Sequence, residues 1–179
     1  MDTLRSARLD EIDRLNGLIS ASARELSRGY YTSQQVDALI AQVFGVDTQL
    51  LRDQTYYVIE RDGELLACGG WSHRRTLFGG DQAKAGTDSD LDPRTEAARI
   101  RAFFVHPSAA RRGLGRRLLA HCEQQAFEAG FQRAELMATL PGEPLYRAAG
   151  YQAVERVSYP LAGSEAVEFV RMVRVLSRA

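Results

Sequence analysis

The alternation of apolar and polar positions along the chain predicts a mixture of helices and strands. Apolar residues three or four positions apart predict one helix with Asp10 as its N-cap and a second helix that begins near Thr32 and ends at about Gly45. Apolar runs on either side of Asp62-Gly63 predict a hairpin, because this dipeptide adopts the positive φ angles of a tight turn. In total we expect strands at residues 3–8, 55–61, 64–75, 97–105, 133–138, 151–161 and 166–175, and further helices at 114–129 and 141–149.

The order of these elements predicts an α/β fold. A strand, a helix and a strand between residues 97 and 138 form a unit whose two strands should be parallel neighbours with a right-handed crossover. Hairpins on both sides of this unit make the sheet mixed, and we expect helices on both of its faces. A polar stretch from residue 78 to 95 has no periodicity, and loops of this length are typically functional or mobile.

Length and charge narrow the class of protein. A chain of 179 residues is expected to form a single domain, residues 1–179, with its own hydrophobic core. Lys plus Arg and Asp plus Glu both number 23, so there is no overall attraction to nucleic acid or to a membrane surface. The chain has no apolar run of membrane-spanning length and no apolar segment of the signal-peptide type near Met1, and we expect a cytoplasmic protein. Cys68 and Cys122 lack metal-ligand spacing; we expect both in the core and no bound metal.

The most informative segment is a basic, glycine-containing loop between a strand and a helix. Glycines let phosphate oxygens approach the backbone closely, and the free N–H groups at a helix N-terminus attract anions. Arginines at the same place add full positive charge. The spacing fits neither a Rossmann nor a nucleoside-triphosphate loop, so a different phosphorylated cofactor is indicated. The loop residues are Arg111, Arg112, Gly113, Leu114, Gly115 and Arg116.

Two motifs resemble the GNAT superfamily of acyl-CoA-dependent N-acetyltransferases. The first, residues 110–115, resembles the signature Arg/Gln-x-x-Gly-x-Gly/Ala, and it departs from it at Ala110. The second, Tyr146 followed by Gly150-Tyr151, resembles the end of the helix after the family's fifth strand. The order of elements agrees over nearly the whole chain, although the specific motifs are confined to residues 102–119 and 135–151. The resemblance implies acetyl-CoA as cosubstrate and a mostly antiparallel sheet with one splayed parallel pair.

The resemblance also implies roles for particular residues. The main chain of Phe103 and Val105 would hold the pantetheine arm, with the Phe103 N–H near the thioester carbonyl, where a backbone donor stabilises developing negative charge. Tyr146 would protonate the departing thiolate, since a phenol is protonated at neutral pH. Thr139 lies where relatives often have an asparagine that contacts the cofactor. The basic loop would bind the phosphates.

The acceptor site is predicted from strand alternation. Arg99 and Arg101 should share a face with Phe103 and Val105, because side chains alternate along a strand. If this face lines the acceptor cleft, the two arginines would bind an anionic group on the acceptor. The alternative is that both arginines pair with acidic neighbours on an exposed face of the sheet.

No carboxylate on this strand matches the glutamate that family members often use as general base. His73 is our candidate base, because imidazole titrates near neutral pH, and Glu96 is a weaker candidate. Trp71, on the same face as His73, is a candidate wall of the acceptor pocket, although aromatic residues at such spacings are more often core residues.

The sequence therefore predicts direct transfer of an acetyl group from acetyl-CoA to a primary amine of a small metabolite, with an anionic group expected on that metabolite. Two alternatives remain: a non-catalytic sensor of acyl-CoA on the same fold, and an acetyltransferase of protein N-termini or lysines. The expected partner is a small-molecule amine, with neither nucleic acid nor membrane, and a homodimer stays open beside a monomer.

Overall fold

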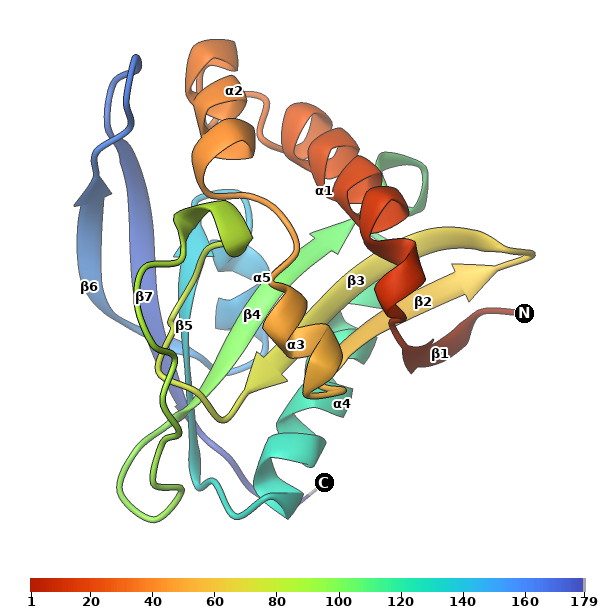
Figure 1. The fold of residues 1–179 in the computed structure, drawn as a ribbon, viewed down its shortest axis with the longest axis vertical. Coiled ribbons are helices and arrows are strands. Elements are labelled where there is room, and N and C mark those ends of the chain that lie inside the picture. The colour runs from red at the N-terminus through yellow and green to blue at the C-terminus, as the bar shows by residue number, and fades with distance from the viewer. Residues whose placement is uncertain (179) are drawn as a thin grey trace.

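In the computed structural model, which describes residues 1–178, a seven-stranded sheet runs through the molecule in the order β1-β2-β3-β4-β5-β7-β6 (Figure 1). Every neighbouring pair is antiparallel except β4 and β5, which are parallel. This confirms the predicted mixed α/β fold with one parallel pair. The strands are β1 (Thr3–Ser6), β2 (Tyr56–Arg61), β3 (Glu64–Ser72), β4 (Ala98–Val105), β5 (Arg133–Thr139), β6 (Gln152–Tyr159) and β7 (Val167–Val175).

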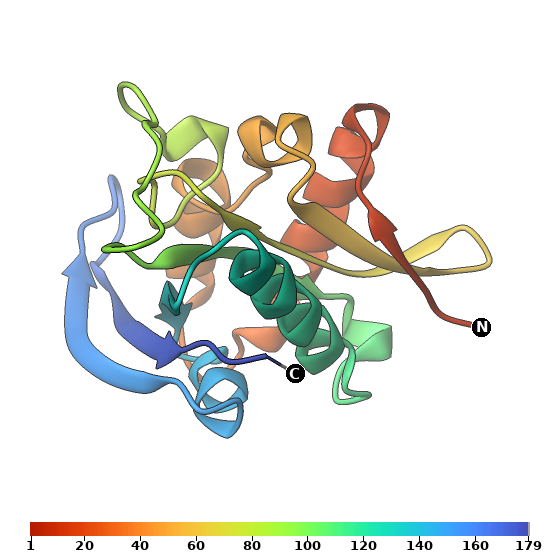
Figure 2. The same ribbon diagram turned by 90° about the horizontal axis from the view of Figure 1, so that it is seen from below.

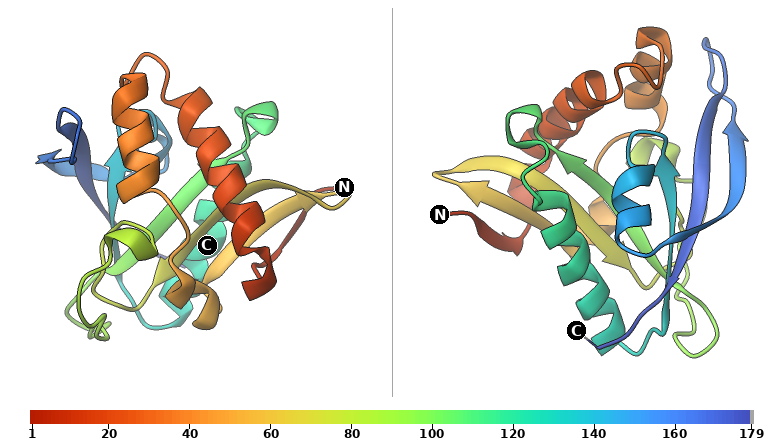
Figure 3. Two further views of the ribbon diagram at one scale, coloured as in Figure 1. Left: turned by 45° about the horizontal axis from the view of Figure 1, so that its top comes forward. Right: turned by 180° about the vertical axis from the view of Figure 1, so that it is seen from behind.

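Helices cover both faces of the sheet. The helix α1 packs on one face of β3 and β4, and α4 packs on the opposite face of the same strands (Figures 2 and 3). Each helix buries an apolar stripe, for example Leu15 and Ile19 of α1 and Leu118 and Cys122 of α4. None of the described helices is both long and apolar enough to cross a lipid bilayer. The helices are α1 (Ile12–Leu26), α2 (Ser33–Gln42), α3 (Thr48–Arg52), α4 (Leu114–Glu128) and α5 (Glu143–Ala148).

Local side-chain contacts determine where the N-terminal helices begin. The Thr32 hydroxyl accepts a hydrogen bond from the Gln35 N–H and the Gln35 side chain accepts one from the Thr32 N–H, so the predicted start of α2 is a capping box. The prediction of Asp10 as the cap of α1 was wrong. A short 3-10 turn, Leu9–Glu11, precedes α1, and the Glu11 carboxylate accepts the Arg8 N–H at 3.0 Å.

Both cysteines are free and fully buried in the core, as expected. Burial raises the pKa of the Cys68 thiol to about 12 and also raises the pKa of Cys122 well above its ordinary value. A thiol that stays protonated is a poor nucleophile, so both residues act as small apolar side chains.

Candidate active site

The two parallel strands separate soon after they meet. Pairing between β4 and β5 is limited to Ala98 with Ala134 and Arg99 with Glu135. Beyond Arg99 the strands diverge, and a gap opens in the middle of the sheet (Figure 1). The β5-facing edge of β4 therefore has no strand partner between Ile100 and Val105.

A β-bulge lies on β4 at this gap. The pairing register with β3 shifts between Cys68 and Gly70, and Ala102 has a φ of 52°, a left-handed conformation that non-glycine residues seldom adopt. The Tyr56 hydroxyl holds the bulge by donating to the Ala102 carbonyl at 2.8 Å. A Cβ on Gly69 would lie 2.7 Å from the Phe103 ring, so the strand opposite the bulge requires glycine at this position.

The bulge reverses the alternation of side chains. Phe103 and Val105 pack in the cluster that contains Ile100, whereas Ala102 and Phe104 pack against the other face, beneath α1. The prediction that Arg99 and Arg101 share a face with Phe103 and Val105 was wrong, because one extra residue moves every later side chain to the opposite face.

The same geometry directs main-chain groups of Phe103 and Val105 into the gap. The His106 N–H donates to the Leu66 carbonyl on β3 at 2.8 Å. Main-chain groups alternate between the two edges of a strand, so those of Val105 and Phe103 point away from β3. An extended ligand arm could therefore add to this edge as an extra strand.

The basic loop before α4 forms an anion-binding concavity beside the gap. Arg111 and Gly113 have φ values of 64° and 79°, and this alternation of handedness turns successive N–H groups toward one side. The amides of residues 111–116 have no hydrogen-bond acceptor among the described residues. The side chains of Arg111, Arg112 and Arg116 are exposed, and none of them pairs with a carboxylate of residues 1–178. Six free amides and three unpaired cations fit a polyphosphate group.

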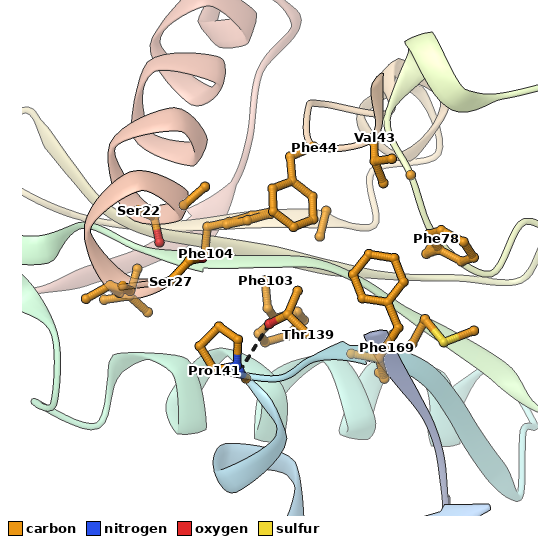
Figure 4. A pocket seen from close by; sticks show the side chains of 18 of the residues that line it. Ser22, Ser27, Val43, Phe44, Phe78, Phe103, Phe104, Thr139, Pro141 and Phe169 are labelled. Atoms are coloured by element: carbon orange, nitrogen blue, oxygen red, sulfur yellow. Dashed lines mark hydrogen bonds between the residues drawn. The ribbon is translucent and has the colours of Figure 1, made fainter. Parts of the chain in front are cut away.

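A cavity of about 220 Å³ passes through the gap from one face of the sheet to the other (Figure 4). On the α4 side it is lined by the residues expected to hold the cofactor, including Phe103, Val105, Gly115 and Thr139. A Cβ on Gly115 would lie 3.2 Å from Leu145, so glycine lets α4 and α5 approach closely here. On the α1 side it is lined by the end of α1, residues 43–45, residues 77–80, Phe104, Met137 and Phe169.

Tyr146 on α5 faces this cavity and is only 8% exposed. Its ring makes edge contacts with Phe103 at 6.4 Å and with Tyr151 at 5.8 Å between centroids. Its hydroxyl has no hydrogen-bond partner in the described part of the chain. Burial raises the pKa of this phenol, so it is protonated at neutral pH. Thr139, across the turn, is already engaged, because its Oγ1 accepts the Gly142 N–H at 3.1 Å.

The structure does not bring His73 or Trp71 into the cavity. The imidazole of His73 lies outside it, 2.8 Å from Asp90 and 3.6 Å from Asp53. Trp71 is a core residue, 6% exposed, whose ring packs edge-on against Phe131 on the α4 face. Glu96 is also outside the cavity and pairs with an arginine at 2.7 Å. The predictions of His73 as the general base and of Trp71 as a wall of the acceptor pocket therefore do not fit this cavity.

Neither arginine predicted to bind the acceptor reaches the cavity. Arg99 pairs with Glu135 at 2.6 Å. Arg101 is 1% exposed, pairs with Asp47 at 3.0 Å, and donates to the carbonyls of Thr76 at 3.1 Å and Gly79 at 2.7 Å. Both residues pair with a carboxylate, as the alternative expected, but the face is not exposed, because the side chains of Arg99 and Arg101 are only 15% and 1% exposed. Arg101 instead fixes the loop that follows Thr76, and this loop forms part of the cavity wall.

Sequence reasoning missed the side chains on the α1 side of the cavity, Phe44, Phe78, Met137 and Phe169 among them. They come from four separated segments, so no local motif joins them. One signal was present: the paired glycines at positions 79 and 80, where a Cβ would meet Ala83 at 2.8 Å and Gly45 at 2.6 Å, mark a close approach of two chain segments.

The chain thus combines a splayed strand pair, a cavity at the gap between the two strands, and a helix start with free amides and exposed arginines. The family model described as Acetyltransferase (GNAT) family matches residues 20–151, and the chain belongs to this family. No curated protein sequence matches the chain.

Solved structures share the fold at low sequence identity. A GCN5-related N-acetyltransferase of Rhodopseudomonas palustris has a TM-score of 0.72 at 16% identity, over 98% of this chain and 96% of that one. The PaiA N-acetyltransferase of Thermoplasma acidophilum, in complex with coenzyme A, has a TM-score of 0.66 at 10% identity, over 98% and 99%. YncA of Salmonella typhimurium, solved with its cofactor acetyl-CoA, has a TM-score of 0.64 at 14% identity, over 99% and 95%.

Proposed function

We propose that residues 1–179 act as one N-acetyltransferase domain that moves an acetyl group from acetyl-CoA to a primary amine of a small molecule by direct attack. The observation that carries the proposal is the cavity through the sheet. It joins the free edge of β4 and the Tyr146 phenol on one side to a mostly apolar chamber on the other. Two reactants entering from opposite faces would meet at the gap.

The chain's own residues fit a CoA thioester. The amides of residues 111–116 and the three exposed arginines would hold the pyrophosphate, and the Phe103 and Val105 main chain would bind the pantetheine arm as an added strand. When bound, acetyl-CoA supplies an activated acyl group. The Phe103 N–H would donate to the thioester oxygen as negative charge develops on it, a contribution of about 3 kcal/mol for one such donor.

Tyr146 would act as the general acid. Its phenol lies at the gap with no competing protein partner and with a raised pKa. In the proposed step the amine nitrogen bonds to the acetyl carbon and the carbon–sulfur bond breaks. The Tyr146 proton passes to the sulfur, the proton lost by the amine leaves to solvent, and the Tyr146 phenolate takes up a proton from solvent before the next turnover.

The cavity supplies no general base. Among its lining residues, all of them described, Tyr146 is the only titratable side chain. The acceptor ammonium must therefore lose its proton because of desolvation, since a charged amine is disfavoured in an apolar chamber. We propose that the amine enters as its neutral, nucleophilic form.

The test combines acetyl-CoA binding, followed by calorimetry, with amine-dependent release of CoA. Tyr146→Phe should lower kcat by about 10²-fold, the lower end for loss of a general acid, and leave the acetyl-CoA Kd within about twofold. Tyr30→Phe is the matched control, because Tyr30 is 51% exposed and lies outside the cavity. Unchanged kcat in Tyr146→Phe would remove the residue from the chemistry, and loss of acetyl-CoA binding would assign it a structural role.

A further inference from the structure

The α1 side of the cavity is an aromatic chamber. Phe44 and Phe104 meet edge-on with centroids 5.4 Å apart, and Phe78 meets Phe169 in the same way at 5.6 Å. Met137 completes the wall, and Figure 4 shows the rings of Phe44, Phe104, Phe78 and Phe169 arranged around one space. The four phenylalanines come from the segment after α2, from β4, from the loop after β3 and from β7, and Met137 comes from β5.

No charged side chain lines this chamber or the rest of the cavity within the described chain. An ionic cluster of Arg101, Asp47 and Lys84 lies behind the wall, and its charges pair with one another, although Arg101 Nε has no hydrogen-bond partner among the described residues. Both oxygens of Asp47 accept from Lys84 Nζ at 2.9 and 2.8 Å, and Arg101 donates to Asp47 and to two carbonyls. A carboxylate or a second ammonium on an acceptor would therefore be buried without a counter-charge, which is strongly unfavourable.

Two hydroxyls are the exception to the apolar wall. Ser22 and Ser27, near the end of α1, are each 4% exposed and line the cavity, and their side chains have no hydrogen-bond partner in residues 1–178. A neutral amine has two N–H donors and one acceptor, so it can bond to one or both hydroxyls on its way to the thioester.

Building on the proposed function, we infer that the acceptor is a small monoamine with an uncharged apolar body, either aromatic or aliphatic. The amine is the one polar group of the acceptor for which the chamber provides hydrogen-bond partners, and the aromatic rings contact the apolar remainder of the acceptor. This replaces the anionic acceptor expected from Arg99 and Arg101, neither of which lines the cavity.

The test uses probe pairs that differ by one charge. 2-Phenylethylamine is compared with phenylalanine, which adds a carboxylate, and butylamine with 1,4-diaminobutane, which adds an ammonium. CoA release and the acetylated product are both measured. We expect kcat/KM to favour the uncharged body by about 100-fold or more in each pair, because burial of an unpaired charge is costly.

Acyl-CoA donors of increasing chain length form a second arm, because an apolar chamber could instead hold a long acyl chain. We expect acetyl-CoA to be used better than octanoyl-CoA. Equal or better use of phenylalanine or diaminobutane, or preference for octanoyl-CoA, would overturn the inference and leave N-acyl transfer intact. Absence of CoA release with every amine and donor would instead defeat the proposed function, and the inference with it.

Variants of the wall provide an independent check. Phe78→Ala should raise KM for 2-phenylethylamine about tenfold, in the range expected for lost apolar contacts in a pocket, with a smaller effect on butylamine. Phe127→Ala is the matched control, because Phe127 is also half-buried but lies on α4, outside the cavity. Equal KM values for the two variants, with both shown to be folded by thermal unfolding, would contradict the placement of the acceptor in this chamber.

Discussion

The buried ion cluster behind the acceptor chamber yields a prediction that links stability to substrate binding. Arg101 and Asp47 have side chains that are each 1% exposed. Arg101, on β4, donates hydrogen bonds to the carbonyls of Thr76 and Gly79. Asp47 also forms an ion pair with Lys84 of the same loop. We predict that removing the charge of Asp47 destabilises the fold strongly and that removing Arg101 loosens the chamber wall.

The magnitude follows from what each substitution leaves behind. Asp47→Asn leaves the Arg101 guanidinium buried without a counter-charge, which should cost about 3–5 kcal/mol. For a chain of this size that corresponds to a fall in Tm of about 10 °C. Arg101→Met leaves Asp47 paired with Lys84, but it deprives two loop carbonyls of their donor, at about 1–3 kcal/mol each where they are buried. The double variant should lose less free energy of unfolding than the sum of the two single variants, because each single substitution leaves a buried polar partner without its counterpart.

Urea and thermal unfolding measure the loss of stability, and steady-state kinetics measure the effect on amine binding. Arg101→Met should raise KM for the amine about tenfold, since residues 77–80 line the chamber, and leave the acetyl-CoA Kd unchanged, since the phosphate loop precedes α4. Arg94→Met, which removes an exposed pair with Asp92, is the control and should leave Tm and KM unchanged. A Tm of Asp47→Asn within about 3 °C of the parent protein would contradict this prediction, because so small a loss would mean that the Arg101 charge is solvated without Asp47.

Three further predictions concern the phosphate loop, the reaction's pH dependence and acid stability. Gly113→Ala should weaken acetyl-CoA binding measured by calorimetry, because φ is 79° there, whereas Gly17→Ala, on an open helix surface, should stabilise the fold by about 0.5–1 kcal/mol and leave binding unchanged. Log kcat/KM should rise with pH at a slope of one between about pH 7 and 9, because the neutral amine reacts and the raised pKa of Tyr146 keeps the acid protonated; a bell-shaped profile with a limb near pH 6.5 would reveal a base that the cavity lacks. Hydrogen bonds from Arg5 lower the pKa of Glu11 from 4.5 to about 2, so the stability that Glu11 contributes is full above about pH 5 and is lost as the pH falls toward 2. Glu11→Gln should therefore flatten this part of a curve of Tm against pH. A variant curve parallel to that of the parent protein would contradict this role of Glu11.

Local signals made much of the fold predictable. Apolar periodicity located the two N-terminal helices and every strand, and Asp62-Gly63 located the hairpin turn, whose φ values are 50° and 82°. The loop at residues 111–116 was recognisable because glycine and arginine at a helix start have a local physical meaning. The five-residue helix α3 was missed, since one turn is too short to show a period.

The acceptor half of the site could not be predicted in the same way. A single bulge at Ala102 inverted the faces of β4, and the Tyr56 hydroxyl that bonds to it lies 46 residues away in the sequence. Arg101 was misassigned because its partner Asp47 is 54 residues distant and no pattern announces the pair. The glycines at 69 and 70 were the one local trace of the bulge, because a strand interior seldom has glycine without a close approach.

We propose that an acetyl group passes from CoA to an amine in the cavity through the sheet. The most direct test is to mix the protein with acetyl-CoA and 2-phenylethylamine and to follow free CoA and N-acetylated product together. We expect equal amounts of both products, formed only when the amine is present, and a kcat about 100-fold lower in Tyr146→Phe. Tight acetyl-CoA binding without transfer to any amine would contradict it and favour a sensor of acyl-CoA, and absence of binding would contradict the cofactor site itself.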